Sequence, residues 1–230
     1  MERLLLYDID GTLTRTQNGY VPFNEAVFKS FGVRGDIRSV LPDGNTDPRI
    51  VEEIFAKANH AVAIDEPMWQ IFEGQLQESY TAAVRQGITT IRPLPGAAEL
   101  LKSLFAKDDF SQGVVTGNFA ATAKVKLDFA GLSSYLFGGA FASDSPHRPD
   151  LPGIAKARWE TLTGRRIVAE RCVIIGDTPK DLEAARHNGM KCLLVGTGRY
   201  PVEELVLWRP DACLPDLTDI SEVVGTLLGL

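Results

Sequence analysis

Several short runs of apolar residues, three to six residues long, recur along the chain between longer mixed segments. Leucine and β-branched residues fill these runs without alternating polar positions, a pattern typical of strands buried on both faces of a parallel sheet. The predicted strands comprise residues 4–7, 113–116, 135–140, 172–176, 192–195 and 212–214.

The segments between these runs carry apolar residues at helical spacing, and two of them begin with clear start signals. Thr178 is an N-cap followed by proline at the first helical position, and Asp219 forms a capping box with Glu222. Strands that alternate with helices predict an α/β fold, a Rossmann-like parallel sheet core flanked by helices. The predicted helices comprise residues 96–107, 120–130, 149–163, 178–188 and 219–228.

One long block interrupts this alternation. Between Arg15 and Gln86 no strand pattern occurs, and the apolar spacing predicts helices over 24–31, 47–58 and 67–85. We therefore predict an all-helical cap domain, residues 15–87, inserted into an α/β core of residues 1–14 plus 88–230. The alternative is that these helices pack within a single domain.

Composition narrows the classes of function. The chain has 230 residues, 44% of them hydrophobic, and a net charge of −6, so the basic footprint of a nucleic-acid-binding protein is missing. No apolar run approaches the ~20 residues that span a bilayer, and the first run is too short for a signal peptide, so we expect no membrane attachment. Cys172, Cys192 and Cys213 form no metal-binding pattern and favour a reducing cytoplasm. Monomer and homodimer both remain open.

Two carboxylates follow the first predicted strand directly. Asp8 and Asp10 are spaced i, i+2, so they leave the sheet edge close together and on one side. Two close carboxylates repel each other unless a cation intervenes or one of them keeps a proton. The pair therefore indicates a Mg²⁺ site or a nucleophile beside an acid, although Asp10 followed by Gly11 is by itself also typical of a turn.

Polar residues also follow other strands, at the sheet edge where parallel sheets bind ligands. Thr116 ends the second strand, and Gly117 and Asn118 add backbone N–H groups that suit a phosphate. Asp177 and Asp181 follow the fourth strand, at the start of a helix. Each motif alone has a plainer explanation as a turn or a helix cap, but their coincidence at one edge favours a functional site.

A cation site beside an anion site is the arrangement that these residues predict. Asp8, Asp10 and Asp177 supply the oxygen ligands that Mg²⁺ prefers. Arg148, just before Pro149, supplies the compensating positive charge for an anion, and Lys156 is the other candidate for that role.

These motifs resemble those of the haloacid dehalogenase-like hydrolase superfamily over essentially the whole chain. Residues 8–12 match its first motif, Thr116 with the Gly-Asn pair is similar to the second, and residues 176–181 are similar to the fourth. The inserted block resembles the helical cap of phosphoglycolate phosphatase-like members. The third motif departs from the family pattern, because Arg148 stands where members usually have lysine.

This resemblance implies a Mg²⁺-dependent phosphatase that hydrolyses a small phosphomonoester through an aspartyl-phosphate. Asp8 would attack phosphorus, and Asp10 would protonate the leaving oxygen and then activate water. Asp177 would bind the metal, with Asp181 orienting it. Asp10 points to phosphoryl transfer, because the superfamily's dehalogenases lack the second aspartate. The implied phosphate-binding residues are Thr116, Gly117, Asn118 and Arg148.

The substrate itself stays open at this point. The resemblance makes phosphoglycolate the first substrate to test, while nucleotides, sugar phosphates and pyrophosphate remain alternatives. A phosphotransferase of the sugar phosphomutase type would use the same core, and a non-catalytic phosphate-binding module would lack a catalytic group. Residues 44–47, Tyr20 and Phe23 are candidates for contacting the substrate, or for packing the cap on the core.

Overall fold

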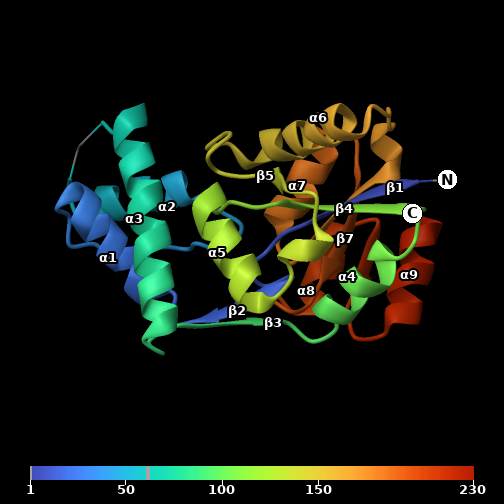
Figure 1. Cartoon of the computed structure of the whole chain (residues 1–230), viewed down its shortest axis with the longest axis horizontal. Helices are drawn as coiled ribbons and strands as arrows, with labels where there is room; N and C mark the ends of the chain where they lie inside the picture. The colour runs from blue at the N-terminus through green and yellow to red at the C-terminus, as the bar shows by residue number, and fades with distance from the viewer. Residues whose placement is uncertain (1, 61–62) are drawn as a thin grey trace.

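A six-stranded parallel sheet forms the centre of the core domain in the computed structural model, which describes residues 2–60 and 63–230 (Figure 1). The strand order is β5-β4-β1-β6-β7-β8, which puts the first strand of the chain in the middle. All five strand pairings are parallel, as expected for βαβ connections. The strands are β1 (Arg3–Tyr7), β4 (Phe110–Val115), β5 (Gly139–Ala140), β6 (Cys172–Gly176), β7 (Lys191–Val195) and β8 (Ala212–Leu214).

Helices cover both faces of this sheet, and strand β1 shows why its sequence is apolar throughout. Leu4 and Leu6 face one apolar cluster, whereas Leu5 and Tyr7 face the other, because successive side chains point to opposite faces. The first cluster includes residues of α6 (Leu151–Thr163), α7 (Pro179–His187) and α8 (Val202–Leu205). The second includes residues of α4 (Ala97–Phe105), α5 (Ala120–Ala130) and α9 (Ile220–Gly229). The predicted fold class is confirmed.

The inserted region forms a helical cap beside the core (Figure 1). It contains α1 (Tyr20–Phe31), α2 (Asp47–Lys57) and α3 (Glu66–Arg85), with a short 3-10 turn over Ile37–Ser39. Aromatic rings fill its interior: the Phe31 and Phe72 centroids are 5.1 Å apart. Phe119 of the core contacts the same cluster, 5.9 Å from Phe72, so the cap interior continues into the core domain.

A two-stranded antiparallel ribbon joins the cap to the core. Strand β2 (Thr14–Gln17) pairs with β3 (Thr90–Pro93). We expected no strand between Arg15 and Gln86, and β2 shows that this expectation was wrong at its first residues. The sequence Thr-Arg-Thr-Gln gives no buried-strand signal because this ribbon has no further strand on either side.

The boundaries of the other predicted elements agree with the sequence to within a few residues, but β3 and α8 (Val202–Leu205) had no predicted counterpart, and the sheet edge differs. The strand expected over residues 135–140 is a 3-10 turn, Ser133–Tyr135, followed by the two-residue strand β5. β5 is an edge strand and pairs only with β4. The other apolar residues of the expected strand therefore pack without joining the sheet. Further 3-10 turns cover Arg148–Asp150, Ala169–Arg171 and Val206–Trp208.

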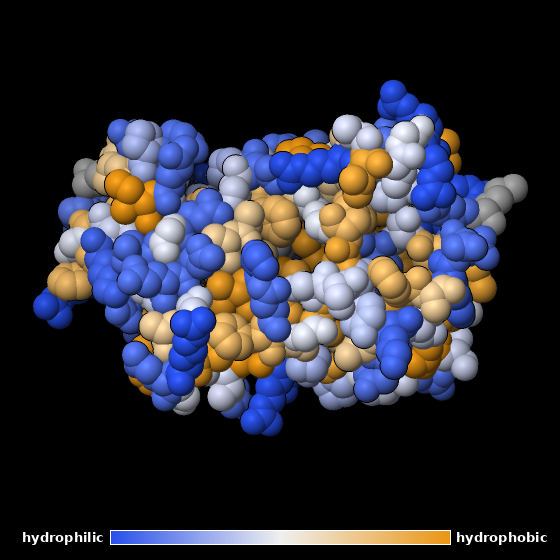
Figure 2. All heavy atoms as spheres, viewed as in Figure 1, coloured by the Kyte–Doolittle hydropathy of each residue, from blue (hydrophilic) through white to orange (hydrophobic). Residues whose placement is uncertain are grey.

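Surface character differs between the two parts of the molecule. Figure 2 shows hydrophilic side chains over most of the cap, and apolar side chains gathered over the middle of the view, around α5. Within the described ranges, no helix has both the length and the apolar character required to cross a membrane.

Candidate active site

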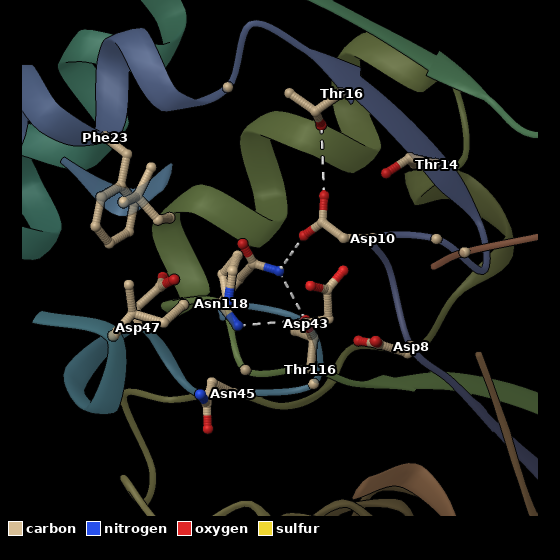
Figure 3. Close-up of a pocket in the computed structure, with 18 of the residues that line it drawn as sticks. Asp8, Asp10, Thr14, Thr16, Phe23, Asp43, Asn45, Asp47, Thr116 and Asn118 are labelled. Atoms are coloured by element: carbon tan, nitrogen blue, oxygen red, sulfur yellow. Dashed lines mark hydrogen bonds between the residues drawn. The ribbon is translucent and has the colours of Figure 1, made fainter. Parts of the chain in front are cut away.

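A cleft of about 630 Å³ lies between the cap and the loops that follow the core strands (Figure 3). It is where the strand-end residues meet, as the topology of a parallel sheet predicts. Asp181 and Lys156 are not among its lining residues. The expected site residues that do line the cleft are Asp8, Asp10, Thr116, Gly117, Asn118, Arg148 and Asp177.

Asp8 directly follows strand β1, at the floor of the cleft, and is only 5% exposed. Its backbone N–H donates to the Ile175 carbonyl at 2.8 Å, which continues the pairing of β1 with β6. The Arg148 Nη2 lies 3.1 Å from Oδ2 of Asp8. Burial raises the pKa of Asp8 to about 6, while Arg148 acts in the opposite direction.

Three buried carboxylates converge beside Asp8. Asp8, Asp177 and Asp181 each place an oxygen within 4.8 Å of the others, a donor set of the kind that holds a divalent cation. Burial, and then the neighbouring acids, raise the pKa of Asp177, which is the cost of this crowding when no cation is bound. The set shares Asp8 and Asp177 with the predicted magnesium ligands, and has Asp181 in the place where we expected Asp10.

Asp177 fits only because its neighbours are small. Its Oδ1 accepts a hydrogen bond from the Thr12 hydroxyl at 3.0 Å. A Cβ at Gly11 would lie 2.5 Å from the other carboxylate oxygen, and one at Gly198 would lie closer still. Gly198 belongs to a loop to which the sequence assigned no function, so its role in making room for Asp177 was missed.

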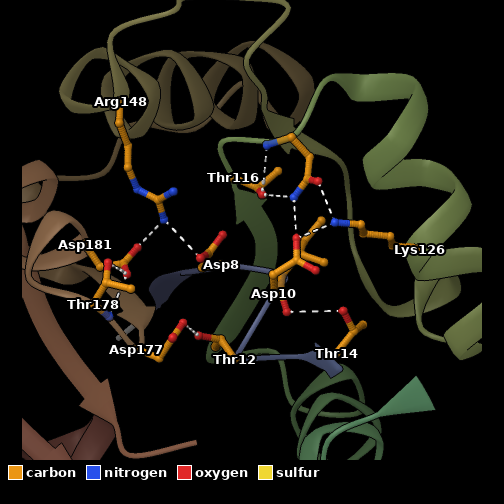
Figure 4. Close-up of polar contacts among 12 residues, drawn as sticks. Asp8, Asp10, Thr12, Thr14, Thr116, Lys126, Arg148, Asp177, Thr178 and Asp181 are labelled. Carbon is orange, nitrogen blue, oxygen red and sulfur yellow. Dashed lines mark hydrogen bonds and ion pairs between the residues drawn. The ribbon is translucent and has the colours of Figure 1, made fainter. Parts of the chain in front are cut away.

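Arg148, rather than Lys156, carries the positive charge of the site. It is 6% exposed, and its guanidinium contacts both Asp8 and Asp181 (Figure 4). Burial opposes its charge, but the two carboxylates together raise its pKa. Its Nε has no hydrogen-bond partner although it is buried. Lys156 instead pairs with Glu160 at 2.8 Å on the surface of α6.

Asp181 serves as the anchor for Arg148. Its Oδ2 accepts hydrogen bonds from the backbone N–H of Thr178 at 3.1 Å and from the Thr178 hydroxyl at 2.8 Å. Thr178 is the N-cap of α7, so the capping motif that starts the helix also fixes the carboxylate. The other oxygen, Oδ1, binds Arg148.

Asp10 lies apart from the acidic cluster and is held by a lysine that the sequence analysis missed. Lys126 Nζ is 2.5 Å from Asp10 Oδ2, and Asn118 Nδ2 donates to the same oxygen at 2.8 Å (Figures 3 and 4). Burial would raise the pKa of Asp10, but Lys126 and the hydrogen bonds outweigh it, so the pKa is lowered. The signal available was a lysine, Lys126, between apolar Val125 and Leu127 in a predicted helix.

Lys126 and Asn118 tie several parts of the site together. Lys126 is 5% exposed, donates to Asn118 Oδ1 at 2.7 Å, and lies 5.5 Å from the centre of the Tyr80 ring in the cap. Asn118 Nδ2 also donates to the Thr116 hydroxyl at 2.8 Å. The side chain of Asn118 therefore makes its hydrogen bonds to other side chains of the protein.

A cap segment, residues 43–47, lies across the core loops; we call it the latch loop. Its Asp47 N–H donates to the Gly117 carbonyl at 2.7 Å, and its Thr46 hydroxyl donates to the Pro146 carbonyl at 2.7 Å. A Cβ at Gly117 would lie 2.0 Å from the Asn45 carbonyl oxygen, so only glycine allows this close approach.

Side chains of the latch loop bind the core as well. Asn45 accepts a hydrogen bond from Lys180, at the start of α7, and Asp43 lies 3.4 Å from Arg199, after β7. With the contacts above, the latch loop touches the loops after β4, β5, β6 and β7. Residues 44, 45 and 47, together with Tyr20 and Phe23, line the cleft.

Asp47 makes the most unusual contact of the latch loop. Its side chain is buried, and its Oδ2 accepts the Phe119 N–H at 2.9 Å across the cap–core boundary. Burial raises the pKa of Asp47 to about 7, and Lys126 only partly opposes this effect.

Comparison with known proteins places the chain in a family. The family model described as haloacid dehalogenase-like hydrolase matches residues 5–186. The chain belongs to the haloacid dehalogenase-like hydrolases. The resemblance drawn from the motifs is thus confirmed, and helices α1–α3 supply the helical cap expected of this hydrolase.

Relatives of this haloacid dehalogenase-like hydrolase match over nearly their whole length. A probable phosphatase IndB of Dickeya dadantii is 25% identical, covering 100% of this chain and 96% of its own. A phosphoglycolate phosphatase of Photorhabdus laumondii is 22% identical, covering 97% and 92%. A pyrophosphatase PpaX of Listeria monocytogenes is 24% identical, covering 96% and 95%. The names of these relatives point to different substrates.

Solved structures share the fold. CbbY from Rhodobacter sphaeroides, solved in complex with phosphate, superimposes with a TM-score of 0.67 at 18% identity and covers 96% of each chain. At this level of identity the likeness establishes the architecture of the hydrolase.

Proposed function

We propose that this protein is a Mg²⁺-dependent phosphatase that hydrolyses a small phosphomonoester through an aspartyl-phosphate on Asp8. The observation that carries the proposal is the position of Asp8 at the floor of the cleft, where it lies 3.1 Å from Arg148 and forms the acidic cluster with Asp177 and Asp181. A nucleophile in this position has both a cation and a metal-binding set beside it.

The acidic cluster fits a magnesium ion because it offers only carboxylate oxygens from buried aspartates. Asp8 and Asp177, with Asp10 or Asp181, would hold the ion. When bound, it would neutralise the crowded carboxylates and the charge on a transferring phosphoryl group.

The residues around Asp8 have different roles in the proposed reaction. Arg148 holds Oδ2 of Asp8, which leaves Oδ1 to attack phosphorus in line and form the aspartyl-phosphate. Thr116 and the backbone N–H groups of Gly117 and Asn118 are the groups we assign to the phosphate oxygens, with Arg148 as the counter-charge.

Proton movement is assigned to Asp10. Asp10 gives a proton to the leaving oxygen and then takes one from the water that cleaves the aspartyl-phosphate. Lys126 lowers the pKa of Asp10 and so favours the carboxylate that the second step needs. The first step therefore requires that Asp10 gain its proton as the substrate binds.

The test is phosphate release from p-nitrophenyl phosphate and a panel of phosphomonoesters, with Mg²⁺ and with a chelator. We expect activity only with the metal, loss of activity in Asp8→Asn, and normal activity in Asp65→Asn, a matched change at the N-cap of α3. Acid quenching during turnover should trap one phosphoryl group on Asp8. Activity that survives both the chelator and Asp8→Asn would refute the proposal.

A phosphotransferase of the sugar phosphomutase type would form the same aspartyl-phosphate but return the phosphoryl group to a sugar. Incubation with a sugar phosphate separates the two reactions, because a mutase yields an isomer and a phosphatase yields free phosphate.

We also propose a reducing cytoplasmic setting, supported by the free thiols of Cys172, Cys192 and Cys213. The partner is a small phosphorylated metabolite. Whether the enzyme is a monomer or a homodimer is a question for light scattering.

A further inference from the structure

The cleft extends well beyond the place where a phosphate would lie. Its volume of about 630 Å³ is within the range of about 300–1,000 Å³ that holds drug-sized ligands, so a two-carbon leaving group would leave most of it empty. Apolar and polar side chains both line the cap side of the cleft. The apolar ones are Tyr20, Phe23, Ile37, Val40, Pro42, Ile50 and Tyr80.

Two cations near the cap side of the cleft already have acidic partners. Arg38 lines the cleft, but its guanidinium binds Asp36 through Nη2 at 2.7 Å and Nε at 3.0 Å, and it lies 4.0 Å from the centre of the Tyr20 ring. Lys126, on α5 of the core, is bound to Asp10 at 2.5 Å. Both of these cations therefore already have an acidic partner.

Three further cations line the cleft. Arg199 lies 3.4 Å from Asp43 of the latch loop, and Arg148 belongs to the phosphate site. Arg15, also among the lining residues, donates to the Thr197 carbonyl at 3.0 Å at the exposed rim. Arg15 has no carboxylate partner among the described residues, but its side chain is exposed, as is that of Arg199, so neither is a buried counter-charge beside Asp47.

An acid, by contrast, does lie at that part of the cleft. Asp47 is buried and receives one backbone hydrogen bond, from Phe119, and no cation forms an ion pair with it in the described chain. The charged groups that act on it are Lys126, which is bound to Asp10, and the acids Asp10 and Glu73. Neither protonation state of Asp47 provides a positive charge.

Resting on the proposed function, we propose that the natural substrate is a phosphomonoester whose leaving group is uncharged and contains a ring, as in nucleoside monophosphates and sugar phosphates. Such a group packs on the aromatic wall and hydrogen-bonds to Asp47. A carboxylate, as in phosphoglycolate, or a second phosphate, as in pyrophosphate, would meet Asp47 with no buried cation free to compensate its charge. The cleft thus favours one class of substrate, whereas the names of the relatives point to several.

The test compares kcat/KM at pH 8 with Mg²⁺ for uridine 5′-monophosphate, glucose 6-phosphate, phosphoglycolate and pyrophosphate. We expect one of the two esters with an uncharged ring to exceed both anionic substrates by at least about tenfold, since like-charge juxtaposition is strongly unfavourable. The ratio of the nucleotide to the sugar phosphate tells which ring is preferred. A higher kcat/KM for phosphoglycolate or pyrophosphate overturns the inference, while p-nitrophenyl phosphate reports separately on whether the protein is a phosphatase at all.

Two substitutions test the charge argument directly. Asp47→Asn removes the acid, and Asp36→Asn frees Arg38 while keeping the amide oxygen that caps the 3-10 turn. Both should raise kcat/KM for phosphoglycolate relative to glucose 6-phosphate by about tenfold, and Asp65→Asn should leave that ratio unchanged. An unchanged ratio in both variants overturns the inference. The wild-type panel stands alone if Asp47→Asn does not fold.

Discussion

Replacement of Asp47 by asparagine should stabilise the protein, and the gain should grow with pH. The side chain is 6% exposed, and its pKa is raised by burial from 3.8 to about 7. At about 1.4 kcal/mol for each pH unit, that difference corresponds to about 4 kcal/mol. Solvent screening does not reduce the value much, because the group is buried.

The sign follows from which state binds the proton more tightly. Because the folded pKa lies above the unfolded one, Asp47 contributes its full stability below about pH 4 and loses it as the pH rises through 7. Asparagine does not titrate, so Asp47→Asn does not lose this stability as the pH rises. The free energy of unfolding of Asp47→Asn, minus that of the wild type, should therefore rise by about 4 kcal/mol between pH 4 and pH 8.

Urea unfolding followed by tryptophan fluorescence measures this difference at several pH values. Asp47→Ala is the matched control: it should show the same pH trend but a constant loss of about 1–2 kcal/mol, because the Phe119 N–H loses its acceptor. A difference between wild type and Asp47→Asn that is the same at pH 5 and pH 8 would refute the reasoning.

Three further changes test the site. Arg148→Met should lower kcat/KM by about 10²–10³ because phosphate loses its counter-charge, and Arg148→Lys should recover part of it in steady-state assays; equal loss in both would argue for a purely structural role. Lys126→Met should raise the pKa of Asp10, so the acidic limb of the kcat–pH profile should move to higher pH; an unmoved limb would exclude coupling between the two side chains. Gly117→Ala should push Asn45 and the latch loop away and lower kcat at least about tenfold, with faster hydrogen exchange at the amide bound to the Gly117 carbonyl; normal exchange would contradict it.

Much of the fold and of the candidate site could be predicted because both depend on local sequence signals. Strand β1 is apolar at every core position, so burial on both faces was evident before the structure. Asp8, Thr116 and Asp177 each follow such a strand, and the rule that ligands bind at strand ends brings them together. Their roles as nucleophile, phosphate contact and metal ligand remain predictions.

What was missed depends on contacts that no local pattern contains. Lys126 and Asp10 are 116 residues apart, so the position of the lysine between two apolar residues indicated burial but not its partner. Strand β2 is polar, because it pairs only with β3. Asp47 had the sequence of a helix start, and only the packing of cap on core turns it into a buried acid.

The latch loop has a consequence for how this enzyme could change over time. Asp47, the acid that we propose faces the leaving group, is one of the five residues of the latch loop. On that proposal, a substitution there that alters which leaving group is accepted would also alter how firmly the cap is held, and with it the rate at which products leave. Substrate selectivity and turnover rate could then not be changed independently through the latch loop.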